Sequence, residues 1–376
     1  MDLDLTDEQT WLSESIETLL EREWIGAEKA HDAGEPERGR LWSALVEFGA
    51  LTVARDEGLG AVELCLAARA MGAHLASVPY IGSAALRFTV EPFAADLPER
   101  FTELADADDR ASIALLEPGS SWSLPDARAR LEADGLQGDK VAVEHAAGVE
   151  CLAVVAVVSG APGLVLVQAG EPRLEVSAQP AFDVTVPMSA VSFAGAEPAA
   201  VASGAVAGEL LARMTTIGAL LAAAEAVGAA GAMLDDARRY AGERRQFGRT
   251  IGSNQALRHL MADMYVRQTS AWSTVLYAAA ALDDEMADAH QSAAVAKAYV
   301  ARAAREIAHG SMQVFAGIAF TEEHPAHRFL RRIVVREQQF GDAAHHEREL
   351  GRALVSRVAE RPHSAAAPQT PPAPVS

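Results

Sequence analysis

The chain has 376 residues, more than one compact hydrophobic core usually serves, so two or three packed modules are expected. A formal net charge of -20 at pH 7 repels phosphate backbones and argues against nucleic acid as a partner. The two cysteines, Cys65 and Cys151, lie far apart without paired or metal-type spacing, which favours two core thiols in a reducing, cytoplasmic setting. The acidic start lacks the basic and apolar regions of a secretory signal. The most apolar stretch, 217–232, is interrupted by Glu225, which favours a buried helix over a membrane span.

Residues 1–108 predict an N-terminal helical domain. Thr6 followed by Gln9 is a capping-box pattern, and apolar residues then recur at helical spacing. Further apolar stripes follow, and the one from Leu64 to Leu75 is expected to form a single helix.

Residues 109–204 predict a middle β domain, a small barrel or sandwich. Short apolar or β-branched runs alternate there with Gly and Pro, as is typical of strands and turns. The expected strands are SIALL, KVAV, CLAVVAVV, GLVLV, VTV and VSF.

Residues 205–360 return to the helical period and predict a C-terminal helical bundle, because long Ala-rich segments allow close helix packing. The tail 361–376 is rich in Pro and poor in large apolar groups, so it is expected to be disordered. The predicted fold class is therefore α+β.

Three strings in the last module stand out: YAGERRQFGRTIGSNQALRHLMADM, QVFAGIAFTEEHPAHRFLRR and EQQFGDAAHHEREL. Taken alone they have ordinary explanations. Arg238, Arg239, Arg244 and Arg245 are typical of the solvated face of a helix, and Gly317 is typical of a helix C-cap.

These strings, in a chain ordered as helices, β domain and bundle, resemble the acyl-CoA dehydrogenase family. The resemblance covers nearly all of the chain before the tail. It implies that family's fold, in which the C-terminal bundle has four helices, together with an acyl-CoA substrate and FAD. In the family, residues of the RxQFG and QxxxG strings reach across a subunit interface to a neighbour's FAD. We call the corresponding positions the donor half: Arg244, Gln246, Phe247, Gln255, Gln313 and Gly317. A guanidinium can grip a pyrophosphate with two parallel donors, and a Gly lets backbone N–H groups approach it closely.

The positions that would serve the chain's own reaction centre, here called the home half, have changed. Dehydrogenation in the family needs a carboxylate that removes the α-proton of the thioester while hydride leaves to the flavin. The resemblance places that Glu at Phe340, or in some relatives at Gly218, so no catalytic residue is assigned.

The flavin contacts of the home half have changed as well. Leu116 stands where the family has a Thr, and Ala142 and Glu144 replace a Trp and a Thr. Asp342 replaces a Thr near the cofactor's phosphates, where an anion is unfavourable without a compensating cation.

An intact donor half beside a degraded home half favours a heteromer. The chain resembles the paired-subunit acyl-CoA dehydrogenases of actinobacterial steroid side-chain breakdown. The resemblance thus implies a catalytic acyl-CoA dehydrogenase partner, with α2β2 as one stoichiometry, FAD shared across the interface, and an electron-transfer flavoprotein as a candidate further partner. No nucleic acid or membrane partner is expected.

Two alternatives stay open. The chain could be a self-sufficient dehydrogenase whose base has moved to Asp342, Glu337 or Glu225, although the first two are more typical of solvated loop charges and Glu225 of a pair between helices. It could also be a structural helical protein without flavin. The histidines His324, His327, His345 and His346 lack a completing Cys or carboxylate, and GxGxxG is absent, so neither a metal nor a nicotinamide site is expected.

Overall fold

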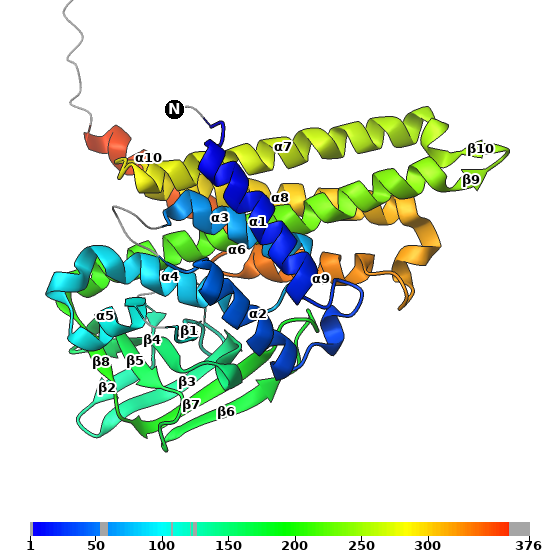
Figure 1. The fold of residues 1–376 in the computed structure, drawn as a ribbon. Coiled ribbons are helices and arrows are strands. Elements are labelled where there is room, and N and C mark those ends of the chain that lie inside the picture. Colours follow the sequence, from blue (N-terminus) through cyan, green and yellow to red (C-terminus); the bar gives the residue numbers. More distant parts are fainter. Residues whose placement is uncertain (1–2, 53–58, 107, 121, 123–125, 361–376) are drawn as a thin grey trace, which may run out of the picture.

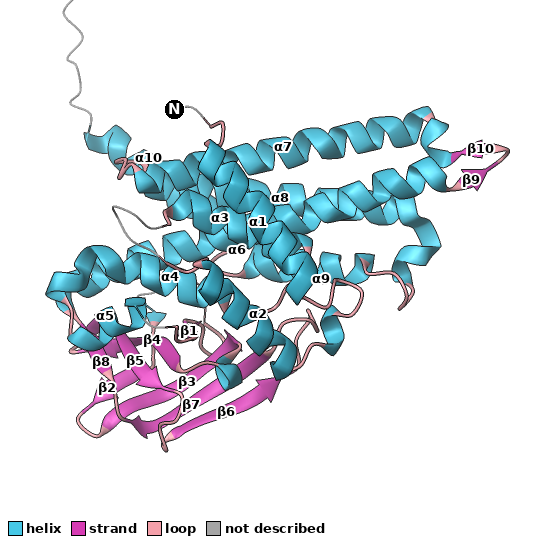
Figure 2. Cartoon of the chain, viewed as in Figure 1, coloured by secondary structure: helices cyan, strands magenta, loops and turns pink. Residues whose placement is uncertain are grey.

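The computed structural model describes residues 3–52, 59–106, 108–120, 122 and 126–360. The tail 361–376, predicted to be disordered, lies outside the described residues. The described chain forms helices, then a sheet, then a long helical bundle, and the sheet lies along one side of the helices (Figures 1 and 2). The predicted fold class is confirmed.

The N-terminal part is helical, as predicted. Thr6 accepts a hydrogen bond from the Gln9 backbone and its own N–H donates to the Gln9 side chain, so the capping box is present. The helices are α1 (Asp7–Glu23), η1 (Ala30–Asp32), α2 (Glu35–Phe48), α3 (Ala61–Ala73), α4 (Tyr80–Val90), η2 (Glu91–Asp96) and α5 (Glu99–Asp106).

Helix α3 is shorter than predicted. It ends at Ala73, and Leu75 takes a left-handed φ of 49° instead of continuing the helix. The next N–H, of Ala76, donates back to the Met71 carbonyl, which closes a helix-terminating turn of the kind that usually places Gly at the left-handed position. The apolar period alone could not reveal this stop, because Leu75 is buried whether or not it is helical.

The middle part is an eight-stranded mixed sheet. Its strands follow the order β6-β7-β3-β2-β4-β5-β8, and β1 pairs with β4 in parallel. The strands are β1 (Ala111–Ala114), β2 (Arg130–Glu132), β3 (Gly135–Glu144), β4 (Cys151–Val158), β5 (Ala161–Gln168), β6 (Leu174–Gln179), β7 (Met188–Ala196) and β8 (Ala200–Ala202), with η4 (Ala146–Gly148) between β3 and β4.

Strand β4 is buried on both faces, which explains its unbroken apolar run. Ala153 and Val155 face a core shared with α4, α5 and α6, whereas Leu152 and Val154 face a second core enclosed by the sheet itself. The sheet is therefore packed against the helices on one side and curls over its own core on the other.

One predicted strand is wrong. Residues 184–186 form no strand, because the Asp183 carboxylate accepts hydrogen bonds from the backbone and the hydroxyl of Thr185 and fixes a turn. The pattern also missed β6, a strand with few buried residues.

The C-terminal part is a bundle built on α6 (Gly204–Glu243). Helix α6 is long and apolar enough to cross a membrane by length and composition, but 89% of its most apolar window is buried inside the structure, so it serves as a core helix, as predicted. The other elements are β9 (Arg245–Gln246), β10 (Arg249–Thr250), η5 (Ile251–Ser253), α7 (Gln255–Asp283), α8 (Ala289–Phe315), η6 (Ala316–Phe320), α9 (Ala326–Gln338) and α10 (Ala343–Glu360).

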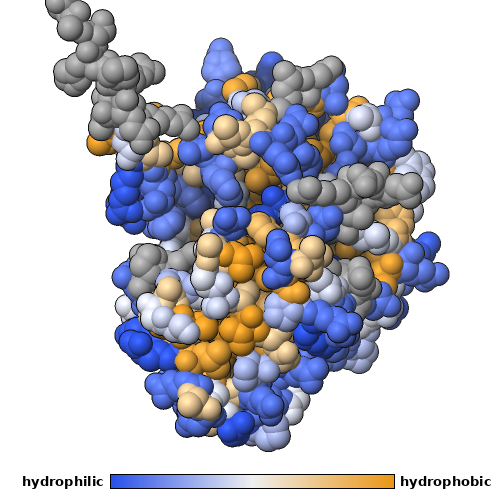
Figure 3. Space-filling view, turned by 90° about the vertical axis from the view of Figure 1, so that its left-hand side faces the viewer, coloured by the Kyte–Doolittle hydropathy of each residue, from blue (hydrophilic) through white to orange (hydrophobic). Residues whose placement is uncertain are grey.

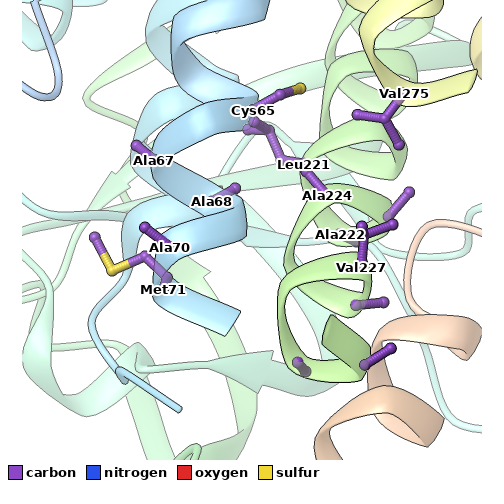
Figure 4. Packing of buried hydrophobic residues seen from close by; sticks show 14 of the residues in the cluster. Cys65, Ala67, Ala68, Ala70, Met71, Leu221, Ala222, Ala224, Val227 and Val275 are labelled. Atoms are coloured by element: carbon purple, nitrogen blue, oxygen red, sulfur yellow. The ribbon is translucent and has the colours of Figure 1, made fainter. Parts of the chain in front are cut away.

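The N-terminal helices dock on the bundle through a close crossing of α3 and α6 (Figure 4). A Cβ at Gly72 would lie 1.9 Å from the Glu225 carbonyl oxygen, and one at Gly228 would lie 1.8 Å from the Arg69 carbonyl oxygen. Both glycines are therefore required, because only a residue without a side chain lets the two backbones touch. Cys65 is buried in this contact and Cys151 in the sheet, both as free thiols, as predicted.

Candidate functional site

The hairpin between α6 and α7 carries the first three donor-half residues. Helix α6 ends at Glu243, so Arg244 and Arg245 lie in extended chain and not on a helix as predicted. Strands β9 and β10 pair Gln246 with Arg249, and Phe247 and Gly248 between them have φ values of 52° and 78°. Two positive φ values in a two-residue hairpin loop give a turn that twists with its strands but normally excludes a bulky residue. Phe247 is 97% exposed at this tip.

The other donor-half residues lie near the same end of the bundle (Figure 1). Gln255 begins α7, Gln313 lies in the last turn of α8, and Gly317 lies in η6; all three are exposed. The rings of Tyr240 and Phe315, 5.7 Å apart, join the end of α6 to the end of α8. The structure thus brings the hairpin and η6 to the same end of the bundle, although α7 and α8 lie between them in the sequence.

The expected C-cap at Gly317 is also wrong. Ala316 caps α8, with φ 56° and ψ -136°, a conformation that is normal for Gly and strained for Ala. Gly317 follows in η6 with open space around its Cα.

The four arginines near the hairpin divide into two pairs. Arg238 and Arg239 pair with Asp235 and Asp236 on the same helix, which matches the ordinary solvated-face explanation. The side chains of Arg244 and Arg245 make no hydrogen bond or ion pair with any described residue. Each of these two guanidinium groups has donors available for an anion.

In the home half, the two positions expected for a Glu touch each other. A Cβ on Gly218 would lie 2.5 Å from Cε1 of Phe340, so the Phe340 ring occupies the space directly above the α6 backbone. The ring also stacks with Trp122 at a centroid distance of 6.2 Å. Neither position offers a group that can accept a proton.

A buried ion cluster fills the junction between the sheet and the bundle. On α9, Arg332 contacts Asp183 at 2.5 Å and Glu225 at 2.6 Å. Arg336, one turn later, pairs with Glu225 at 3.0 Å and with Glu144. Glu144 stands at a position where the family resemblance places a flavin contact, and here it holds a cation from the chain's own bundle.

Arg336 and Asp183 are held in their charged forms. Burial lowers the pKa of Arg336, but the carboxylates of Glu144 and Glu225 outweigh this effect and raise the pKa above its usual value. Burial likewise raises the pKa of Asp183, but the charge of Arg332 and hydrogen bonds from Thr185 outweigh it, and the pKa is lowered. Opposite charges in a medium of low polarity stabilise each other strongly, so none of these groups is free to hold a ligand.

The neighbouring altered positions are also engaged inside the chain. Ala142 has φ 53° at a register shift in β3, and its N–H donates to the Gln179 side chain at 2.8 Å. The carbonyl of Leu116 accepts from the Val141 N–H at 2.9 Å.

Asp342 lies directly before α10, and its carboxylate accepts a hydrogen bond of 2.7 Å from the His345 backbone. This is the role of a helix N-cap, which Thr and Asp both fill well. An Asp at the position where the resemblance places a Thr therefore keeps the cap but puts a negative charge at the helix end that is otherwise suited to bind phosphate.

The three candidate displaced bases are all occupied. Glu225 pairs between helices with two arginines of α9, as its ordinary explanation predicted. Glu337 is not a solvated loop charge: it is buried in α9 and paired with Arg305. Asp342 is the N-cap and is only half-buried.

A cavity of about 460 Å³ lies beside Phe340, at the end of the molecule where α6 and α8 begin. This end faces the viewer in Figure 3, where apolar residues gather below the centre of the view. The lining of the cavity is mostly apolar and includes Leu115, Trp122, Ala219, Ala293 and Phe340. Thr216, also in the lining, is hydrogen-bonded to His290. Burial lowers the pKa of His346 in its wall to about 4, so this imidazole is neutral at pH 7.

The structure gives the histidines ordinary roles. His324 accepts from the Ala326 N–H and packs on Phe315, and His346 hydrogen-bonds the Phe340 carbonyl. Within the described ranges, no three His, Cys, Asp or Glu side chains come together as metal ligands.

Comparison with known proteins agrees with this architecture. The sequence profile of the family "Acyl-CoA dehydrogenase, C-terminal domain" matches residues 209–355. Benzylmalonyl-CoA dehydrogenase of Aromatoleum aromaticum is 28% identical over 356 residues, 89% of this chain and 94% of that protein. Residues 209–355 belong to the acyl-CoA dehydrogenase family.

Other acyl-CoA dehydrogenases share parts or the whole of the fold. Acyl-CoA dehydrogenase IpdE2 of Mycolicibacterium smegmatis is 40% identical over 114 residues, which cover 30% of this chain and only 35% of that relative. A chain of the ChsE4-ChsE5 complex from Mycobacterium tuberculosis superposes with a TM-score of 0.81 at 25% identity, over 94% of this chain and 99% of that one. Butyryl-CoA dehydrogenase from Megasphaera elsdenii has a similar fold, with a TM-score of 0.84 at 19% identity over 94% of this chain and all of that one.

Within this acyl-CoA dehydrogenase fold, sequence reasoning missed Asp183, Arg332 and Arg336. A signal for the arginines was present, because they lie four residues apart on the face of α9 that also buries Phe329 and Ile333. An Arg in an apolar stripe requires a buried anion as its partner. The sequence pattern does not show which acidic residue, in another part of the chain, is that partner.

Proposed function

We propose that this chain is the non-catalytic subunit of a heteromeric, FAD-dependent acyl-CoA dehydrogenase and that it completes the FAD site of a catalytic partner. The observation that carries the proposal is a difference in bonding between the two halves of the site. Home-half positions are engaged by the chain's own groups, whereas the donor-half side chains are exposed and Arg244 lacks any described partner.

The home half does not fit a flavin. A ring placed against the altered strand would meet the Glu144–Arg336 ion pair, and breaking a buried pair costs about 3–5 kcal/mol. A diphosphate near α10 would meet the Asp342 carboxylate at a helix end whose N–H groups it already caps. Without a flavin in the home half, a base at position 340 would have no reaction to serve. The Phe340 ring instead packs in the core over Gly218.

The donor half fits the diphosphate end of a cofactor held by another chain. Arg244 offers a free guanidinium, and open space around Gly317 lets backbone N–H groups approach an anion. Gln246, Gln255 and Gln313 add exposed amides beside it. The FAD would accept the hydride, and the partner would supply the flavin-ring contacts and the base.

The relatives support the kind of assembly and the class of substrate. The ChsE4-ChsE5 structure is a complex of two differently named chains, and another structural neighbour is a steroid acyl-CoA dehydrogenase named for two proteins, Tcur3481-Tcur3483. An acyl-CoA thioester with a steroid-derived acyl group is therefore the substrate class we assign to the complex, with α2β2 as its stoichiometry and the cytoplasm as its location.

The test is to purify the chain alone and together with a catalytic acyl-CoA dehydrogenase subunit, sought first among the products of neighbouring genes, and to measure bound flavin by absorbance. We expect flavin and thioester oxidation in the complex and neither in the lone chain. Flavin and turnover in the lone chain would overturn the proposal in favour of a self-sufficient enzyme, and their absence from both preparations would favour a structural protein.

Two variants sharpen this test. Arg244→Ala is expected to weaken FAD retention by the complex about tenfold or more, because hydrogen bonds to a charged group contribute ~1.5–3 kcal/mol. Arg238→Ala, which removes an exposed arginine already paired with Asp235, is the matched control and should retain FAD normally. Phe340→Glu should not restore activity to the lone chain, because Glu144 and Asp342 still exclude the cofactor.

A further inference from the structure

Helix η6 displays two large apolar side chains to solvent. Ile318 is 41% exposed and Phe320 is 76% exposed, whereas Ala319 between them is fully buried. The buried Ala319 fixes the orientation of this turn. Its two neighbours therefore face outward as part of the packed structure, and not because the segment unfolds locally.

The segment that follows is braced from below. The buried Arg328 donates to the carbonyls of Glu322 and Glu28 at 3.0 and 2.9 Å and ties the loop after η6 to the N-terminal part. Before η6, the strained backbone of Ala316 turns the chain sharply away from α8. A rigid turn that holds two apolar side chains in water costs free energy unless another surface covers them.

These side chains lie at the donor end. Phe320 is three residues from Gly317. The Tyr240–Phe315 contact joins the end of α8, directly before η6, to the end of α6, directly before the hairpin that carries Arg244 and Arg245. The two apolar side chains lie beside positive charge that no described acidic group neutralises. A complementary partner surface would be apolar and would hold an anion next to the apolar part. A flavin-holding chain with its diphosphate at the interface has this chemistry.

We infer that Ile318 and Phe320 form a docking anchor that binds the flavin-holding partner subunit, separately from the residues that contact the cofactor. The inference rests on the proposed function for the identity of the partner. It assigns two tasks to one end of the bundle: η6 supplies apolar contact that holds the subunits together, and the hairpin supplies charge that holds the FAD.

The experiment measures two quantities on the complex with its catalytic partner: the dissociation constant, by dilution and mass photometry, and the flavin bound per assembled complex. Phe320→Ser is expected to raise the dissociation constant about tenfold or more, since burial of Phe favours association and tenfold corresponds to ~1.4 kcal/mol. At saturating subunit concentration the flavin content should match that of the unmodified complex. Ile318→Ser should give a smaller change of the same sign.

Leu354→Ser is the matched control, because Leu354 is 61% exposed on α10, near the opposite end of the bundle (Figure 1). It should change neither quantity, and thermal unfolding of each lone variant should match that of the unmodified chain. A normal dissociation constant for Phe320→Ser would overturn the inference. So would normal assembly with lost flavin, or a lone chain that self-associates through Phe320.

The two proposals fail separately. If Arg244→Ala keeps its flavin while Phe320→Ser weakens assembly, the cofactor role is wrong and the docking anchor stands. If Arg244→Ala loses flavin while Phe320→Ser assembles normally, the cofactor role stands and the anchor is wrong.

Discussion

The ring of Phe340 lies over Gly218, with its Cε1 atom 2.5 Å from the point where a Cβ on that glycine would be. The two residues are 122 positions apart in the printed sequence, and each occupies a place where the family resemblance expects a carboxylate. They are complementary in shape, because the missing side chain of one makes room for the ring of the other.

This complementarity predicts a coupled pair of substitutions. Gly218→Ala should destabilise the lone chain by about 1–3 kcal/mol, because the added methyl overpacks against the ring. In a Phe340→Ala background the same substitution should become neutral or stabilising. Urea unfolding of the single and double variants gives the coupling energy.

Gly208→Ala is the control on the same helix. A Cβ there meets nothing within 4 Å, so this substitution should stabilise α6 by about 0.5–1 kcal/mol. Additive effects of the Gly218 and Phe340 substitutions would contradict the contact.

The buried ion cluster predicts a large loss of stability when its central cation is removed. Arg332→Met should lower the free energy of unfolding by about 3–5 kcal/mol, because Asp183 loses its cation and Glu225 loses one of two. Arg352→Met, which removes an exposed arginine paired with Glu349, should cost less than about 0.5 kcal/mol. Equal, small losses in both variants, measured by urea unfolding, would show that the cluster does not join the sheet to the bundle.

Lys297 predicts a dependence of stability on pH. Its side-chain nitrogen is buried and donates to the carbonyls of Arg336 and Glu337. Burial lowers the pKa of Lys297 from 10.5 to about 7, although Glu337 favours the charged form. Between these two values the unfolded chain binds the proton and the folded chain does not. The free energy of unfolding contributed by this group therefore rises with pH from about 7 to about 10.5.

Lys297→Met removes that proton and should flatten the rise. Urea unfolding at a series of pH values, compared with the unmodified chain, measures the difference. An unchanged slope would mean that Lys297 is charged in the folded state throughout this range.

The strained cap of α8 predicts a stabilising substitution. Ala316→Gly should raise the free energy of unfolding by about 1 kcal/mol, because relief of a strained backbone gains ~1–3 kcal/mol and the extra freedom of Gly in the unfolded chain offsets part of it. Ala262→Gly, at an exposed helical position of α7, should instead cost about 1 kcal/mol. The same sign in both variants would rule out strain at Ala316.

Local sequence patterns predicted the helical N- and C-terminal parts and the middle sheet. They succeeded where the chemistry of the local residues decides the structure. The Thr6 capping box, the buried α6 and the unbroken apolar run of β4 follow from propensity and hydrophobic period. The strand prediction failed at residues 184–186, which are β-branched but form a turn. The Asp183 carboxylate accepts hydrogen bonds from Thr185 within this turn and is also held by Arg332 from a distant part of the chain.

By itself the sequence determined the order of the domains, the family resemblance and the identity of every altered position, since these depend on which residues are present and at what spacing. Only the tertiary structure decided what those alterations do. Glu144 pairs with Arg336, Phe340 fills the space over Gly218 and Asp342 caps α10, and two of these three contacts join residues more than a hundred positions apart. Buried charges and packed rings are stable only with partners at atomic distance, and the fold alone brings such partners together.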